Sequence, residues 1–118
     1  MRKSIFITIL GLLIFNLSCG QNEENYSELI KEAGELYEAK EFKQSAQKYS
    51  EAFSIPGETG KTVDKYNAAC SWALAKEIDS SFVQLYEIVN NRSYSNYQHL
   101  STDKDLTSLH QIRGGQIF

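Results

Sequence analysis

The sequence contains few residues that interrupt helices and none of the common catalytic motifs. Its 118 residues include one proline, Pro56, and seven glycines, of which only Gly34 falls inside a periodic segment. This scarcity of helix breakers predicts long helices. No Gly-x-Ser-x-Gly elbow, phosphate-binding loop or glycine-rich nucleotide fingerprint occurs. We therefore expect no catalysis and no small-molecule substrate.

The sequence also lacks an excess of basic residues. It has 12 lysines and arginines against 15 aspartates and glutamates, a formal net charge of −3. Two of the basic residues, Arg2 and Lys3, lie at the extreme N-terminus, and no basic stripe follows. A mildly acidic surface does not attract phosphate backbones, so a nucleic-acid partner is not expected.

No apolar run is long enough to span a bilayer, which takes about 18–20 residues. The longest run, Ile5 to Leu17, follows Arg2 and Lys3, which is typical of an export signal. Leu17-Ser18-Cys19-Gly20 comes next and resembles the lipobox of bacterial lipoproteins, where a small residue precedes an acylated cysteine. Ser18 and Cys19 match, whereas Asn16 departs from the aliphatic residue usual three places before the cysteine.

The lipobox resemblance implies a signal peptide over residues 1–19 and a lipid anchor on Cys19. The membrane is then one partner, and the bacterial outer membrane or cell surface is the expected location. Residues 20–25 are predicted to be a polar tether. The alternative is ordinary secretory cleavage after Gly20, which would leave a secreted or periplasmic protein.

Four amphipathic stripes follow the predicted tether and predict four helices in antiparallel pairs. The stripes comprise Leu29, Ile30, Ala33, Leu36 and Tyr37; Phe42, Ala46, Tyr49, Ala52 and Phe53; Val63, Tyr66, Ala69, Cys70, Ala73 and Leu74; and Phe82, Leu85, Tyr86 and Val89. A capping box of Asn25 and Glu28 is predicted to start the first helix, and Asp79 or a neighbour the fourth. Pro56-Gly57 is predicted to end the second.

The two helix pairs show an internal repeat at an offset of 36 residues. Ala33 then matches Ala69, and Ser45 matches Ser81. Size and polarity also agree between Ile30 and Tyr66, Tyr49 and Leu85, and Phe53 and Val89. We expect the matched alanines to lie where paired helices approach closely. A period near 34 residues is typical of stacked helix pairs.

The repeat resembles the tetratricopeptide (TPR) family. The residues that carry the resemblance are Glu41-Phe42, Ser45, Tyr49 and Ala52 in the first unit; the run Tyr66 to Ala75, similar to a terminal repeat "YNxACxxAL"; and Asp103 to Leu109, similar to its "DxDLxxL" segment. The resemblance implies an all-α fold over residues 26–112, a TPR-like stack of two antiparallel helix pairs with short C-terminal helices. It also implies a protein-interaction scaffold of the cell envelope, whose protein or peptide partner the sequence does not identify.

Tyr37, Asn67 and Trp72 are the predicted partner-contact patch. The alternatives are that both aromatic residues belong to the core and that Asn67 bonds a neighbouring backbone. Cys70 is interpreted as a small buried residue. His99, Asp103, Asp105 and His110 fit no standard metal spacing, and the aspartates are expected to cap a short helix with Thr102. No metal or cofactor is predicted.

Residues 113–118 depart from the TPR resemblance because Arg113-Gly114-Gly115 is followed by an apolar Ile117-Phe118 end. Two glycines make a poor helix end, so we expect an irregular tail and interpret it as truncated. The alternative function follows from this interpretation: the chain would be a fragment or accessory docking domain of a larger envelope enzyme.

Overall fold

The helix-rich prediction is confirmed. The computed structural model describes the backbone of residues 2–111 and the side chains of residues 20–111, so the Cys19 side chain and the tail 113–118 lie outside the described residues. Within this range there is no strand. The elements are α1 (Arg2–Glu38), α2 (Phe42–Phe53), α3 (Thr62–Leu74), α4 (Ile78–Tyr86), a π-helical turn (Glu87–Asn91), α5 (Tyr97–Thr102), a 3₁₀ turn (Lys104–Leu106) and α6 (Thr107–His110).

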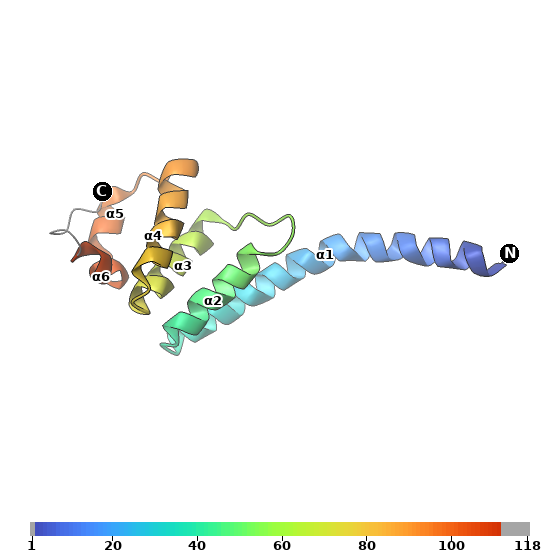
Figure 1. Cartoon of the computed structure of the whole chain (residues 1–118), viewed down its shortest axis with the longest axis horizontal. Helices are drawn as coiled ribbons and strands as arrows, with labels where there is room; N and C mark the ends of the chain where they lie inside the picture. Colours follow the sequence, from blue (N-terminus) through green and yellow to red (C-terminus); the bar gives the residue numbers. More distant parts are fainter. Residues whose placement is uncertain (1, 112–118) are drawn as a thin grey trace.

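Consecutive helices pack against one another along the chain. α1 packs on α2, α2 on α3, and α3 on α4, and the C-terminal elements return to α3 (Figure 1). In the part of the chain with described side chains, no helix has an apolar stretch long enough to cross a membrane.

The predicted start of the first helix, at Asn25, is wrong. Asn25 does not cap a helix, because it lies inside α1, where its Oδ1 accepts a hydrogen bond of 3.2 Å from Gln21 Nε2. The predicted tether 20–25 is likewise helical. Its glutamine and glutamates favour helix and no proline interrupts them, so the helix continues through the segment. Its role as a tether and the predicted domain boundaries stay predictions.

Two turns, one within each helix pair, have the same geometry, and equivalent residues of the two turns are 36 positions apart in the sequence. Lys40 and Lys76 adopt the left-handed conformation, with φ of 60° and 63°. The following residues close each turn, because Glu41 N donates to Leu36 O (2.8 Å) and Glu77 N donates to Trp72 O (2.9 Å). Each turn is a Schellman motif that satisfies carbonyl groups at the helix end. Glu77 precedes α4 without a side-chain cap, so the predicted cap at Asp79 is wrong: Asp79 lies in the first turn.

The same hydrogen bond joins the two helices of each pair. Ser45 Oγ donates to Ala33 O, and Ser81 Oγ donates to Ala69 O, each over 2.7 Å. All four of these residues are fully buried. The alanines allow the close approach that was expected, and the serine hydroxyls bridge the closely packed backbones. The matches of Ala33 with Ala69 and of Ser45 with Ser81 are therefore confirmed in the structure.

The buried residues form a larger and a smaller cluster. The larger lies between α3, α4 and the C-terminal elements and comprises Ala69, Cys70, Ala73, Leu85, Ile88, Leu100, Leu106 and Leu109. The smaller comprises Ala33, Tyr49 and Ala68. Val63 and Tyr86 were predicted in buried stripes, but they are 61% and 68% exposed. They lie in the first turn of α3 and the last turn of α4, and periodicity does not show how far along a helix its neighbour extends.

Tyr26 connects α1 to the start of α3. Its hydroxyl donates to Asp64 Oδ2 (2.7 Å) and accepts from Lys61 N (3.1 Å), and both Tyr26 and Asp64 are buried.

Tyr26→Phe should lower the free energy of unfolding by about 1–3 kcal/mol, because it leaves a buried carboxylate without this donor. Urea unfolding followed by circular dichroism measures the loss. The half-exposed Tyr97→Phe should change stability by less than about 0.5 kcal/mol. Equal effects of the two substitutions would contradict the account.

The Tyr26 contact also predicts a dependence on alkaline pH. Burial, and then the hydrogen bond to Asp64, raise the pKa of Tyr26 to about 12, from an ordinary value of about 10. The folded state therefore keeps the proton where the unfolded state loses it. The stability that this residue contributes is complete below pH 10 and should be lost as pH rises from about 10 to about 12. In this window the stability of Tyr26→Phe should fall less steeply than that of the parent, and parallel profiles would contradict the assignment.

Candidate functional site

A hollow of about 310 Å³ lies where α1, α3 and the C-terminal turn meet, and we call it the inner hollow. Its lining comprises Gly34, Tyr37 and Glu38 of α1, Tyr49 of α2, Tyr66, Asn67 and Cys70 of α3, and Asp103 and Asp105 near the 3₁₀ turn. The first helix of each pair therefore contributes to one concave surface.

The structure brings together two of the three predicted contact residues. Tyr37 and Asn67 both line the inner hollow. Trp72 instead lines a shallow groove with Leu36 and Pro56. At about 100° per residue, Asn67 and Trp72 lie about 140° apart around α3, so they cannot face the same hollow. The three residues therefore do not form one patch.

The predicted alternatives for these residues have different outcomes. Tyr37 and Trp72 are half-buried, so neither aromatic residue belongs fully to the core. The Tyr37 ring packs edge-on against Phe42, with 5.6 Å between ring centres. Asn67 is exposed and lies beside Tyr49. The pKa of Tyr49 is raised, chiefly by burial, and the contact with Asn67 offsets part of this rise.

Two aspartates in the C-terminal turn hold the tyrosine hydroxyls of the hollow. Tyr37 donates to Asp105 Oδ2, and Tyr66 donates to Asp103 Oδ2. The hydrogen bond to Asp105 and then burial raise the pKa of Tyr37, whereas burial and then Asp103 raise that of Tyr66. Both phenols therefore stay protonated at neutral pH, and the turn is tied to α1 and α3.

The capping role predicted for Asp103 is confirmed. Its Oδ1 accepts from Asp105 N over 2.9 Å and so caps the 3₁₀ turn. Thr102 takes no part in this cap, because its hydroxyl donates back to Gln98 O over 2.8 Å. The "DxDL" segment is thus a turn that directs both aspartates toward α3.

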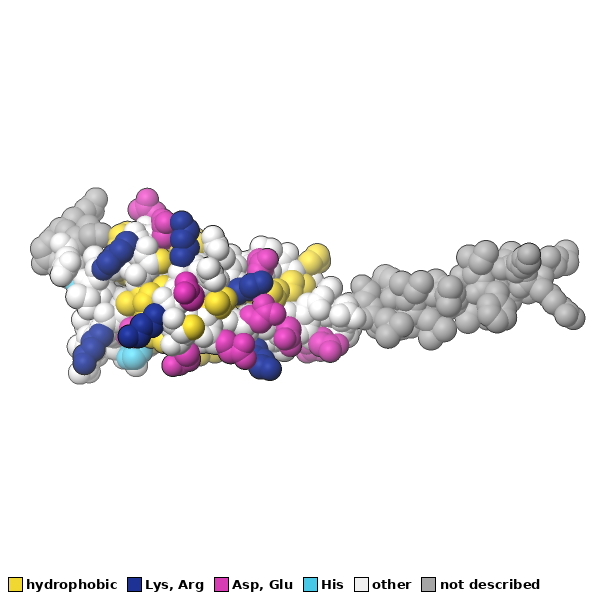
Figure 2. All heavy atoms as spheres, turned by 90° about the horizontal axis from the view of Figure 1, so that it is seen from below, with side chains coloured by type: hydrophobic (Ala, Val, Ile, Leu, Met, Phe, Trp, Pro, Cys, Tyr) yellow, Lys and Arg dark blue, Asp and Glu magenta, His cyan; other side chains and the backbone are white. Residues whose placement is uncertain are grey.

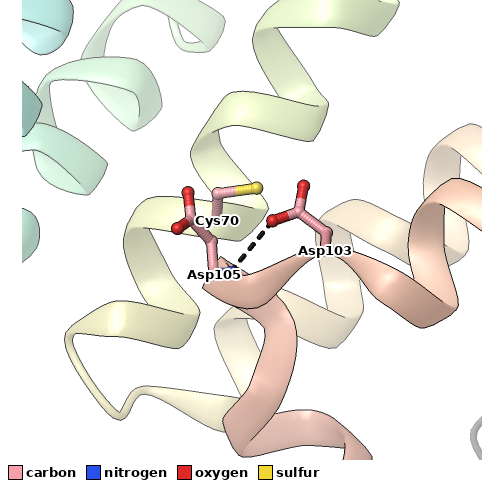
Figure 3. A group of neighbouring side chains, drawn as sticks. All are labelled: Cys70, Asp103 and Asp105. Carbon is pink, nitrogen blue, oxygen red and sulfur yellow. Dashed lines mark hydrogen bonds between the residues drawn. The ribbon is translucent and has the colours of Figure 1, made fainter.

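Cys70 lies between these aspartates (Figure 3). Its side chain is 4% exposed, as the interpretation of a small buried residue requires. Burial, and then Asp103 and Asp105, raise the pKa of the thiol, so it stays protonated at neutral pH and is a poor nucleophile. The sulfur and one carboxylate oxygen from each aspartate lie within 4.8 Å of one another.

The two histidines do not complete the four-residue group considered from sequence. His99 stacks on Tyr66, with ring centres 5.1 Å apart, and its Nε2 lies 3.6 Å from Asp103 Oδ2. The His110 ring nitrogen instead contacts Leu100 O at 2.9 Å. Of the two histidines, His99 therefore lies beside Asp103, whereas His110 does not. Sequence reasoning did not group Cys70 with the aspartates, because it lies 33 positions before Asp103. The "YNxAC" and "DxDL" segments, which the TPR resemblance had already singled out, were the available signal.

The inner hollow carries negative charge. Glu38, Asp103 and Asp105 line it, and no lysine or arginine is among its described lining residues. Figure 2 shows one face of the molecule, on which acidic and basic side chains are interspersed, with hydrophobic side chains exposed between them. Among its described lining residues, the hollow has acids and tyrosines without a basic side chain.

No family model, no curated protein and no solved structure matches the chain.

Proposed function

We propose that the chain is a membrane-anchored, TPR-like scaffold of the bacterial cell envelope. It binds a segment of another protein in the inner hollow and acts by binding, without catalysis of its own. The observation that carries the proposal is the meeting of Tyr37 and Asn67, from the first helices of the two pairs, in one hollow.

The equivalence of the two hairpins supports a TPR-like arrangement. Left-handed turn residues and buried serine bridges recur at 36-residue spacing. Ser45 Oγ also lies 3.0 Å from Ser71 Oγ, which links the second helix of one pair to the first helix of the next. In repeat proteins each unit packs only on its neighbours, which leaves an extended inner face for a partner.

The chemistry of the hollow suits a peptide segment. Tyrosine rings give rigid contact area with little loss of side-chain freedom, and they are enriched at protein interfaces. Tyr37 and Tyr66 are held by their hydroxyl groups, so their rings are already fixed before a partner arrives. The exposed amide of Asn67 offers both a donor and an acceptor to a peptide backbone.

Site-specific photocrosslinking in intact cells tests the proposal. A photoreactive residue at Asn67 should give a discrete protein adduct, and Tyr37→Ala should remove it. The matched control is Asn90, an exposed asparagine whose side chain donates to Tyr86 O away from the hollow. No adduct from Asn67, or the same adduct from both positions, would overturn the proposal.

A further inference from the structure

A thiol and two carboxylates lie close together in the inner hollow. The candidate ligand atoms of Cys70, Asp103 and Asp105 lie within 4.8 Å of one another (Figure 3). Zinc binds sulfur at about 2.3 Å and carboxylate oxygen at about 2.0–2.2 Å, which places neighbouring ligand atoms about 3.3–3.7 Å apart. Binding of an ion would therefore draw these three side chains closer together.

The Cys70 thiol is buried yet lies on the wall of the hollow. It is 4% exposed, is free of a disulfide and lines the hollow together with Tyr66, Asp103 and Asp105. The sulfur therefore lies where an ion that enters the hollow could reach it.

The two aspartates carry charge that the described lining does not balance. The Asp103 side chain is 18% exposed, and its ionic neighbour is His99, at 3.6 Å. No lysine or arginine is among the described residues that line the hollow. Partly buried charges are usually paired or bound to metal ions, so this arrangement favours a cation.

We propose that Cys70, Asp103 and Asp105 bind one divalent transition-metal ion of the Zn²⁺ class. One thiolate and two carboxylates form a mixed sulfur and oxygen set that suits zinc better than magnesium or calcium, which prefer oxygen ligands alone. Because all three residues line the hollow, a fourth ligand such as water would reach the ion from there. This site does not depend on the proposed scaffold function, and its test is independent of crosslinking.

Tyr37 and Tyr66 act as supporting residues of the site. The Tyr37 hydroxyl donates to Asp105 Oδ2, and the Tyr66 hydroxyl donates to Asp103 Oδ2. These hydrogen bonds restrict how each carboxylate can turn. Such partners of ligating groups commonly change metal affinity by about 10–100-fold. Binding forms a sulfur–metal bond and releases the thiol proton to water, so uptake of the ion should acidify a weakly buffered solution.

Titration of the reduced full-length chain with Co²⁺ tests the site directly. Co²⁺ substitutes for Zn²⁺ and gives a near-ultraviolet charge-transfer band when a thiolate binds it. The parent should bind one Co²⁺ with such a band, and Zn²⁺ should displace it. The matched control is Cys19→Ser, which removes the other cysteine of the chain and should keep the band. Cys70→Ser should lose it.

Two milder variants keep the test decisive if Cys70→Ser fails to fold. Asp105→Asn should weaken Co²⁺ binding by more than about tenfold, and Tyr37→Phe should weaken it by about 10–100-fold. His110→Ala should have no effect, because its ring contacts Leu100 O instead of the site. A parent without the band, a band that survives Cys70→Ser, or unchanged binding by Asp105→Asn would overturn the proposal.

Discussion

Ala69→Leu is expected to lower the free energy of unfolding by about 1–3 kcal/mol. Ala69 has no exposed surface, and its carbonyl accepts the Ser81 hydroxyl across the close contact between α3 and α4. A larger side chain there must separate the helices or adopt a strained rotamer. Urea unfolding followed at the helical circular dichroism signal measures the loss.

Ala33→Leu provides a matched second measurement, because Ala33 has the same burial and the same contact, with Ser45. Its cost should fall in the same range. Ala39→Leu, at an exposed position just after α1, should change stability by less than about 0.5 kcal/mol. If Ala33→Leu and Ala69→Leu cost no more than Ala39→Leu, the helices do not meet closely at these alanines.

Cys19→Ala is expected to abolish both fatty-acid incorporation and membrane attachment. Each buried methylene of an acyl chain contributes about 0.8 kcal/mol, so loss of the anchor should move the protein entirely from the membrane to the soluble fraction. Metabolic labelling with a fatty acid, followed by fractionation, measures both effects.

Cys70→Ala is the control for the labelling experiment, because this cysteine is buried in the helical domain and should not affect acylation. It should incorporate label as the parent does. An unlabelled and fully soluble parent would contradict the lipid anchor and favour secretory cleavage after Gly20.

Local sequence signals predicted much of the helical pattern. The breaker pair Pro56-Gly57 and the change of phase near Lys40 correctly indicated the ends of α2, which runs from Phe42 to Phe53. Spacing alone also paired Ala33 with Ala69, and both are fully buried. The start of α1 was missed because a polar segment without breakers is equally compatible with a tether and a helix.

The candidate site was harder to predict because it is assembled from distant segments. Tyr37 and Asp105 are 68 positions apart, and Cys70 meets the aspartates only after the C-terminal turn folds back on α3. Periodicity assigned Asn67 and Trp72 to one helix but did not show that they face different hollows. Helix position could be predicted, whereas the packing of the "DxDL" turn depends on tertiary contacts.

The central claim is that residues 36 positions apart occupy equivalent places in two stacked hairpins. A crystal structure of the chain tests it most directly, through superposition of residues 29–53 on residues 65–89. The account predicts that the two hairpins coincide, with Ser45 bonded to Ala33 O and Ser81 bonded to Ala69 O, as found here. Hairpins that do not superimpose, or serine hydroxyls directed into solvent, would contradict it.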